Sequence, residues 1–293
     1  MQTTQSDDGI AAFSAVRGRL FGIAYRMLGT VADAEDVVQD AWLRWQQTDR
    51  DAVRDPAAFL ATIATRLAIT AATSVQATRV AYIGPWLPEP VQTGADPTLG
   101  AETAEAVELA VLVLLERLTP TERAAYILRE AFGYGFREIA EVLQTSEANA
   151  RQLATRARRH LESERRRPVG RAEHDRLLRA FLAAARAGDV AALENLLAED
   201  AVSYSDGGGV VTAARIPVVG ALRIARFLTG VTEKSGQGID VDFGEWNGSD
   251  AAYITRDGEP VTLATIDVSD RGIERVYIVL NPQKLTRRGS TAG

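Results

Sequence analysis

The chain has 293 residues, which is enough for two or three separate hydrophobic cores. It contains no cysteine and only two histidines, which excludes disulfide bonds and thiolate metal sites and argues against a histidine-based zinc site. Because 33 basic and 39 acidic residues give a net charge of −6, any dense cluster of basic residues opposes the overall charge and indicates an anionic partner.

The N-terminal stretch does not resemble a targeting sequence. The first 30 residues carry Asp7, Asp8, Arg17, Arg19 and Arg26 and lack the apolar core of a signal peptide. No segment elsewhere holds about 18 uninterrupted apolar residues, the usual length of a membrane span. We therefore expect a soluble protein of the cytoplasm with no membrane partner.

Residues 8–81 are predicted to form a helical domain. Apolar residues over 10–47 recur at intervals of three and four, the spacing of a buried helix face, with a break at Gly29. A second helix is predicted over 33–45, with acidic residues in its first turn, and a third begins at Pro56.

Four residues of the second predicted helix share one face by their spacing, namely Asp36, Gln39, Asp40 and Leu43. Such a face is either the solvated side of an amphipathic helix or a contact surface for a partner. From this segment alone, the solvated side is the favoured interpretation.

Residues 82–100 have the composition of a linker, with four prolines and three glycines. The central residues are Trp86, Leu87, Pro88, Glu89 and Pro90. A tryptophan and a leucine are unusual in a solvated linker, so we expect this segment to dock on a folded surface.

Residues 101–167 are predicted to form a second helical domain. Thr119 caps a helix that begins at Pro120, with Glu122 completing a capping box. Two further helices are predicted at 136–143 and at 146–165, separated by two residues. This is the spacing of a helix-turn-helix, whose second helix enters the major groove of DNA.

The last of these helices is strongly basic. From residue 151 to 167, seven arginines stand against two acidic residues, a local net charge of +5. The residues predicted to contact DNA are Arg151, Gln152, Thr155, Arg156, Arg158 and Arg159. Arginine can bond guanine with two hydrogen bonds, and glutamine and threonine make shorter polar contacts.

Residues 171–287 are predicted to form an α+β domain with a cone-like interior. Helical patterns at about 173–187, 189–197 and 221–228 occur with segments that alternate apolar and polar residues, at 201–205, 209–213, 239–246, 250–255, 261–268 and 272–280. Asn-Gly at 247–248 and Asp-Gly at 257–258 predict tight hairpins between strands.

The predicted strands carry candidate pocket residues, namely Tyr204, Asp206, Trp246, Tyr253, Asp267 and Tyr277. Pointing into the cone, they would form an apolar site with a few polar groups, in which an aspartate could act as an acid or base. Alternatively, Asp206 is a turn residue before three glycines and the tyrosines are ordinary core residues.

Several segments together resemble a known family. The segments 33–45 (DAEDVVQDAWLRW), 121–143 (TERAAYILREAFGYGFREIAEVL) and 146–161 (SEANARQLATRARRHL) are similar to bacterial RNA polymerase sigma factors of the extracytoplasmic-function group. The segments 82–90 (YIGPWLPEP), 206–209 (DGGG) and 281–285 (NPQKL) resemble the subgroup with a fused C-terminal SnoaL-like domain. In this order the motifs cover almost the whole chain.

The resemblance implies a multidomain fold of two all-α domains followed by a SnoaL-like α+β domain, with no cofactor and no metal. It implies that Asp36, Gln39, Asp40 and Leu43 contact core RNA polymerase, and that the helix after Ser146 reads the minus-35 element of promoter DNA. It also implies that the C-terminal domain regulates the sigma factor in cis by contacting the helical domains and the linker.

One segment departs from the family pattern. The helix after Pro56 should bind and open the minus-10 element, yet Arg66 and Arg79 are the only charged residues from 56 to 81. Each lost phosphate contact removes roughly one unit of salt-dependent binding. Either uncharged contacts suffice here, or the chain has kept the sigma fold without initiating transcription.

Three functions therefore remain open from the sequence. The first is a promoter-specificity factor regulated by its C-terminal domain. The second is a cyclase, isomerase or hydrolase without a cofactor that uses the SnoaL-like pocket. The third is a regulator that does not initiate transcription and senses a small-molecule ligand in the C-terminal domain.

Overall fold

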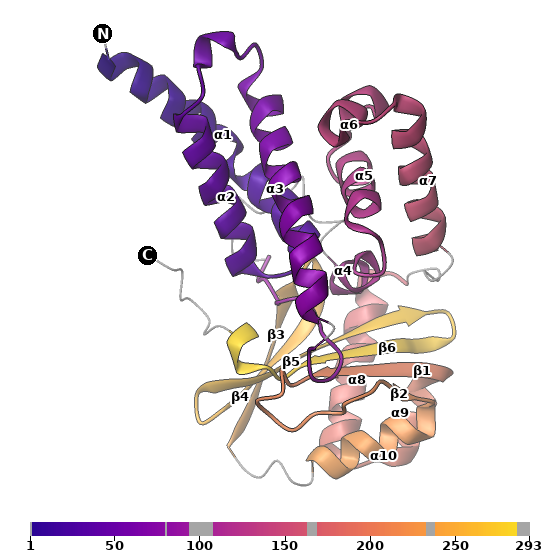
Figure 1. Ribbon diagram of the computed structural model, residues 1–293. Coiled ribbons are helices and arrows are strands. Elements are labelled where there is room, and N and C mark those ends of the chain that lie inside the picture. Colours follow the sequence, from indigo (N-terminus) through magenta and orange to yellow (C-terminus); the bar gives the residue numbers. More distant parts are fainter. Residues whose placement is uncertain (1, 80, 94–107, 163–168, 233–237, 286–293) are drawn as a thin grey trace. The chain divides into compact units, whose positions relative to one another are not determined.

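The computed structural model describes residues 2–79, 81–93, 108–162, 169–232 and 238–285 (Figure 1). The chain divides into two compact units. The N-terminal unit comprises Met1–Val80 and Ala95–Glu164, and the C-terminal unit comprises Ala81–Gly94 and Arg165–Gly293. The first part of the predicted linker therefore belongs to the C-terminal unit.

Three helices form the first part of the N-terminal unit, α1 (Gln2–Leu28), α2 (Val31–Gln46) and α3 (Pro56–Arg79), with a short 3-10 turn at Arg50–Ala52. Thr30 caps α2 by accepting a hydrogen bond from the Asp33 amide at 3.2 Å. The indole Nε1 of Trp45 donates to the Gly9 carbonyl at 2.8 Å and ties α2 to α1.

Helix α3 is unusually apolar. Among the described residues it is the helix whose length and composition, over Pro56–Ser74, would allow it to cross a membrane. The same composition is found in core helices of soluble proteins, and α3 buries Leu60, Ala64 and Ala68 within the unit.

The second part of the N-terminal unit contains α4 (Leu109–Leu115), α5 (Pro120–Glu130), α6 (Phe136–Leu143) and α7 (Glu147–Glu162). The predicted capping box is confirmed, since Thr119 accepts from the Glu122 amide and the Glu122 carboxylate accepts from the Thr119 amide. Gln144 ends α6 with a φ of 53°, which turns the chain into α7. The predicted residues 101–107 lie outside the described residues.

The C-terminal unit packs helices on a mixed sheet. Its elements are α8 (Arg171–Ala187), α9 (Val190–Leu196), β1 (Leu197–Asp206), β2 (Val218–Val219), α10 (Ala221–Thr232), β3 (Ile239–Trp246), β4 (Ser249–Arg256), β5 (Glu259–Ser269) and β6 (Gly272–Val279), followed by a 3-10 turn at Pro282–Lys284. The strand order is β2-β1-β6-β5-β4-β3, with β1 and β6 parallel and the other pairs antiparallel. Helices α8, α9 and α10 cover one face of the sheet (Figure 1).

The local turn chemistry matches the sequence. Asn247 and Asp257 both have positive φ, 51° and 52°, and each precedes a glycine of positive φ, so that both hairpins form as predicted. The strand predicted at 209–213 is wrong, because the amides of Val210 and Val211 both donate to the Gly207 carbonyl and close a turn instead. The helices followed by an α+β domain confirm the predicted fold class.

Candidate functional site

Helix α7 presents its polar residues on one side. All six residues predicted to contact DNA are exposed, namely Arg151, Gln152, Thr155, Arg156, Arg158 and Arg159. The opposite side of the helix is buried through Leu153 and Leu161. A 3.6-residue period therefore separates a packing face from a basic face, as a recognition helix requires.

Three arginines of this basic face form ion pairs, two of them between exposed side chains. Arg151 and Arg158 each pair with a glutamate one turn away on α7, at 3.1 and 2.8 Å. Arg156 lies 3.4 Å from the Glu122 carboxylate of α5. Because exposed ion pairs contribute little to stability, DNA phosphates or bases can replace these carboxylates at small cost.

The four residues predicted to contact polymerase are exposed on α2, namely Asp36, Gln39, Asp40 and Leu43. Leu43 is 46% exposed, a large apolar side chain in solvent on the same face as Asp36 and Asp40. Within the part of the chain that the structure describes, neither Asp36 nor Asp40 takes part in an ion pair. Among the described residues, these two carboxylates therefore have no ion pair to lose when a partner binds.

The two arginines of α3 hold the N-terminal unit together. Arg66 donates from Nε to the Val142 carbonyl and from Nη2 to the Glu141 carbonyl, both at 2.9 Å. Arg79 contacts the Glu116 carboxylate and the Leu28 carbonyl. In this conformation both cations of the segment predicted to bind the minus-10 element therefore make internal contacts.

Arg123 of α5 is a buried cation, 1% exposed. Its Nη1 donates to the Met27 carbonyl at 2.5 Å and to the Glu116 carboxylate at 2.7 Å. Burial lowers the pKa of the Arg123 guanidinium, and the neighbouring Glu116 opposes that shift. This contact joins α5 to the end of α1 inside the unit.

The linker is held in the C-terminal unit by a group of five residues, which we call the linker clasp: Tyr82, Leu87, Asp206, Asn281 and Lys284. The Asp206 carboxylate accepts from the Tyr82 hydroxyl at 2.6 Å and from the Leu87 amide at 2.9 Å. Lys284 Nζ donates to the same carboxylate at 2.7 Å and to the Leu87 carbonyl at 2.5 Å. Asn281 Nδ2 donates to the Tyr82 hydroxyl at 3.0 Å.

The charged pair of the clasp is buried, with Asp206 0% and Lys284 6% exposed. A buried ion pair is tolerated only when further hydrogen bonds satisfy both partners. Here the linker supplies them, through the phenol of Tyr82 and the amide and carbonyl of Leu87. The linker and the ion pair therefore stabilise each other.

The glycines after Asp206 allow this arrangement. Gly208 has a φ of 62°, and a Cβ at that position would lie 2.3 Å from Asn281 Nδ2. A Cβ on Gly209, whose φ is 72°, would lie 2.9 Å from the side chain of Ile83 in the linker. The glycine-rich turn is therefore in close contact with both the clasp and the linker.

The rest of the linker follows the edge of the sheet. The Trp86 ring lies over Lys284 Nζ at 4.3 Å, and Leu87, Pro88 and Pro90 are buried, with Glu89 partly exposed. Val91 exchanges hydrogen bonds with Asn247, at 3.1 and 2.8 Å. The linker is thus part of the C-terminal fold up to residue 93.

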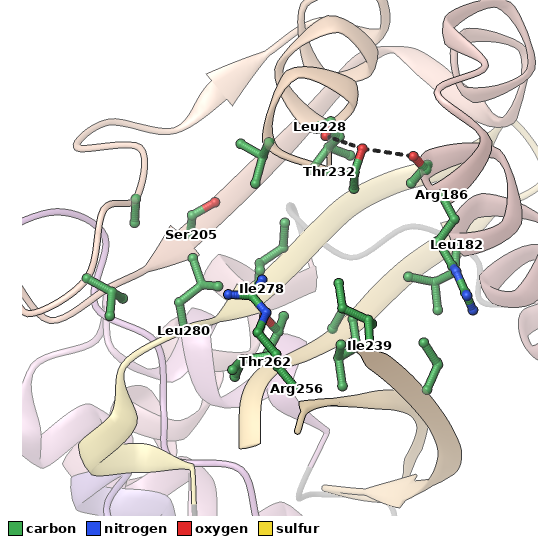
Figure 2. Close-up of a pocket in the computed structure, with 18 of the residues that line it drawn as sticks. Leu182, Arg186, Ser205, Leu228, Thr232, Ile239, Arg256, Thr262, Ile278 and Leu280 are labelled. Carbon is green, nitrogen blue, oxygen red and sulfur yellow. Dashed lines mark hydrogen bonds between the residues drawn. The ribbon is translucent and has the colours of Figure 1, made fainter. Parts of the chain in front are cut away.

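A cavity of about 760 Å³ lies between the sheet and the helices of the C-terminal unit (Figure 2). The predicted pocket residues do not line it, and this placement of Tyr204, Asp206, Trp246, Tyr253, Asp267 and Tyr277 was wrong. On β1 it is Ser205 that faces the cavity, so strand alternation turns its two neighbours to the other side.

The six residues have other surroundings. Tyr204 stacks on Tyr277 with ring centroids 5.7 Å apart, and Trp246 stacks on Tyr253 at 5.5 Å. Asp267 forms an ion pair with Arg275 at 3.2 Å, and Asp206 is the acceptor of the clasp. Burial raises the pKa of the Tyr277 phenol, which keeps it neutral.

Sequence reasoning assigned no role to Tyr82, Asn281 or Lys284. A signal was present, because Lys284 is one of only two lysines beside 31 arginines. An ammonium group on a flexible stem can donate in three directions, which suits a carboxylate and a carbonyl at once.

The comparisons with known proteins agree with this structure. Residues 12–78 match the family model for sigma-70 region 2, and residues 108–161 match the model for sigma-70, region 4. The chain is 37% identical to the ECF RNA polymerase sigma factor SigJ of Mycobacterium tuberculosis, over 94% of this chain and 93% of the relative. It is 33% identical to the probable ECF sigma factor SigI of the same organism, over 75% and 76%.

A solved structure extends the likeness to the whole fold. The crystal structure of Mycobacterium tuberculosis SigJ matches with a TM-score of 0.76 and 36% identity, over 94% of this chain and 97% of that chain. The protein is a bacterial sigma factor that contains regions 2 and 4 of the sigma-70 type. More particularly, it belongs to the extracytoplasmic-function group of RNA polymerase sigma factors.

Proposed function

We propose that this sigma factor directs core RNA polymerase to specific promoters and that its C-terminal domain regulates it in cis through the linker clasp. The observation that carries the proposal is the buried Asp206–Lys284 pair, whose remaining hydrogen bonds go to the linker. The linker joins the two helical regions, and its hydrogen bonds to Asp206 and Lys284 tie it to the C-terminal domain. A change in the C-terminal domain can therefore alter the spacing of the two helical regions.

The contacts with partners are assigned from exposure and charge. The basic face of α7 reads the minus-35 element, with Arg151, Gln152, Thr155 and Arg156 nearest to the bases and with Arg158 and Arg159 nearest to phosphates. On α2, the exposed residues Asp36, Gln39, Asp40 and Leu43 contact core polymerase. The place of action is the cytoplasm, where polymerase and promoter meet.

Promoter opening requires a change within the N-terminal unit. Arg66 and Arg79 cannot meet minus-10 DNA while they donate to α6 and to Glu116. We infer that binding to core polymerase breaks the contacts of α3 with α6 and with Glu116 and releases these two cations.

A regulator that binds DNA without initiating transcription is the second candidate. The specific observation in its favour is the sparse charge of residues 56–81. The enzyme hypothesis has less support, because the cavity in the described part of the chain is lined by no carboxylate, histidine, lysine, tyrosine or cysteine.

Run-off transcription with core polymerase tests these alternatives, on templates chosen by genomic binding. We expect transcript from the full chain, loss of transcript from an Arg151→Ala/Arg156→Ala variant, and a changed yield from Lys284→Met. Arg223→Ala, at an exposed position of α10, is the matched control. If neither the full chain nor a clasp variant gives transcript, the initiation function is refuted; if both still bind minus-35 DNA, the second candidate is favoured.

A further inference from the structure

The cavity of the C-terminal unit has the volume and the lining of a small-molecule site. Its volume of about 760 Å³ lies within the range of roughly 300–1,000 Å³ that is typical of small-molecule sites. Apolar side chains line it from α8, α10 and the sheet, among them Phe181, Leu182, Phe227, Leu228, Ile254 and Ile278. An apolar molecule can bury its surface against such walls.

Polar groups in the cavity are few. The hydroxyl of Thr232 already donates to the backbone, with the Ala185 carbonyl at 2.9 Å and the Leu228 carbonyl at 3.1 Å (Figure 2). Ser205 and Thr262 supply further hydroxyls to the lining. These groups can accept or donate single hydrogen bonds, but they carry no charge.

The charged residues of the lining are two arginines, Arg186 at the end of α8 and Arg256 at the end of β4 (Figure 2). Both are exposed, which places them at the rim. Neither forms an ion pair or a side-chain hydrogen bond with any residue that the structure describes. Two cations beside an apolar cavity, with no acidic partner among the described residues, attract an anionic head group.

The cavity shares short segments of chain with the linker clasp. On β1, Ser205 faces the cavity while Asp206 accepts from the linker. After β6, Leu280 and Pro282 line the cavity and flank Asn281, which bonds the linker phenol. A molecule in the cavity therefore touches the immediate chain neighbours of two clasp residues.

The glycine-rich turn makes a third connection. Val211 lines the cavity, and its amide donates to the Gly207 carbonyl at 3.1 Å. A Cβ on Gly208 or Gly209 would lie within 3.0 Å of the side chain of Asn281 or Ile83, so that the side chain would have to shift. A displacement of this turn on the cavity side therefore changes contacts on the linker side.

We propose that the cavity binds a linear amphiphile, an apolar chain with a carboxylate head group, and that its binding is coupled to the linker clasp. The apolar chain occupies the interior of the cone, and Arg186 and Arg256 attract the head group at the rim. The regulatory meaning of the coupling rests on the proposed function, in which the clasp transmits the state of the C-terminal domain.

Isothermal titration calorimetry of the full chain with dodecanoate, below its micelle concentration, tests the ligand class. We expect saturable binding at one site, and at least tenfold weaker binding of dodecanol, which lacks the charge. Arg186→Gln/Arg256→Gln should weaken dodecanoate binding at least tenfold, while Arg223→Gln on α10 leaves it within twofold. No saturable binding, equal binding of dodecanol, or an unchanged Kd in the double variant would overturn the proposal.

A second titration tests the coupling. Tyr82→Phe removes a hydroxyl of the clasp and does not line the cavity, so a shift of the dodecanoate Kd by threefold or more reports coupling. Tyr134→Phe, in the N-terminal unit, is the matched control and should leave the Kd unchanged. Equal Kd values for both variants and the original chain would refute coupling. These results are independent of transcription, so that either proposal can fail while the other stands.

Discussion

Arg66 donates its Nε to the carbonyl of Val142 at 2.9 Å, so a residue expected to meet promoter DNA is instead bonded to the end of α6. The last carbonyls of a helix carry partial negative charge, which a guanidinium can satisfy without an acidic partner. The same helix contributes Arg79 to the Glu116 carboxylate. The two charged side chains of α3 thus make internal contacts in the free protein.

This arrangement predicts that Arg66→Ala loosens the N-terminal unit. Losing two hydrogen bonds should lower the local stability of α6 by about 1 kcal/mol, which hydrogen exchange of the α6 amides measures. Arg54→Ala, an exposed arginine for which the described structure shows no ion pair, is the control. Equal exchange in both variants would show that Arg66 does not hold α6.

The linker clasp predicts that substitutions of its two charged residues, Asp206 and Lys284, have non-additive effects on stability. Lys284→Met leaves the Asp206 carboxylate buried without its cation, which should cost roughly 3–5 kcal/mol. Asp206→Asn should cost a similar amount, but the double variant should cost clearly less than the two single changes added together. Urea unfolding, followed by a signal that reports on the C-terminal unit, measures these losses of unfolding free energy. Simple additivity of the two single losses would contradict a coupled pair.

Much of this fold could be predicted because its signals are local. The capping box of Thr119 and Glu122 and the hairpin at Asn247 depend on residues within a few positions of each other. The exposed face of α7 likewise follows from periodicity alone.

The failures at the candidate site have one physical cause, which is long-range contact. Alternation along β1 indicated that Tyr204 and Asp206 share a face, but it could not tell which face is the cavity. That was decided by the linker, more than 100 positions earlier in the chain, which supplies the donors to Asp206. The contact between Arg66 and α6 was equally invisible, because it depends on the packing of helices that are distant in sequence.

The glycine-rich turn gives a prediction with a close internal control. Gly208→Ala combines a φ of 62° with a Cβ that would meet Asn281 at 2.3 Å, whereas Gly188→Ala has a φ of 68° and nothing within 4 Å. Both changes incur about 1 kcal/mol of left-handed strain, and only Gly208→Ala should also disturb the clasp. A larger loss of unfolding free energy at 208 than at 188 is therefore expected, and equal losses would mean that the close approach is not important.

The basic face of α7 predicts two kinds of loss. Arg151→Ala and Arg156→Ala should each weaken binding to the minus-35 element by roughly tenfold or more and reduce discrimination between sequences, since base contacts specify. Arg158→Ala and Arg159→Ala should weaken binding to all sequences alike and lower the salt slope by about one each, since phosphate contacts do not distinguish bases. Fluorescence anisotropy of the holoenzyme on matched and scrambled duplexes, over a series of salt concentrations, separates the two classes. A uniform loss at all four positions, with no change in discrimination, would show that α7 binds DNA only through its charge.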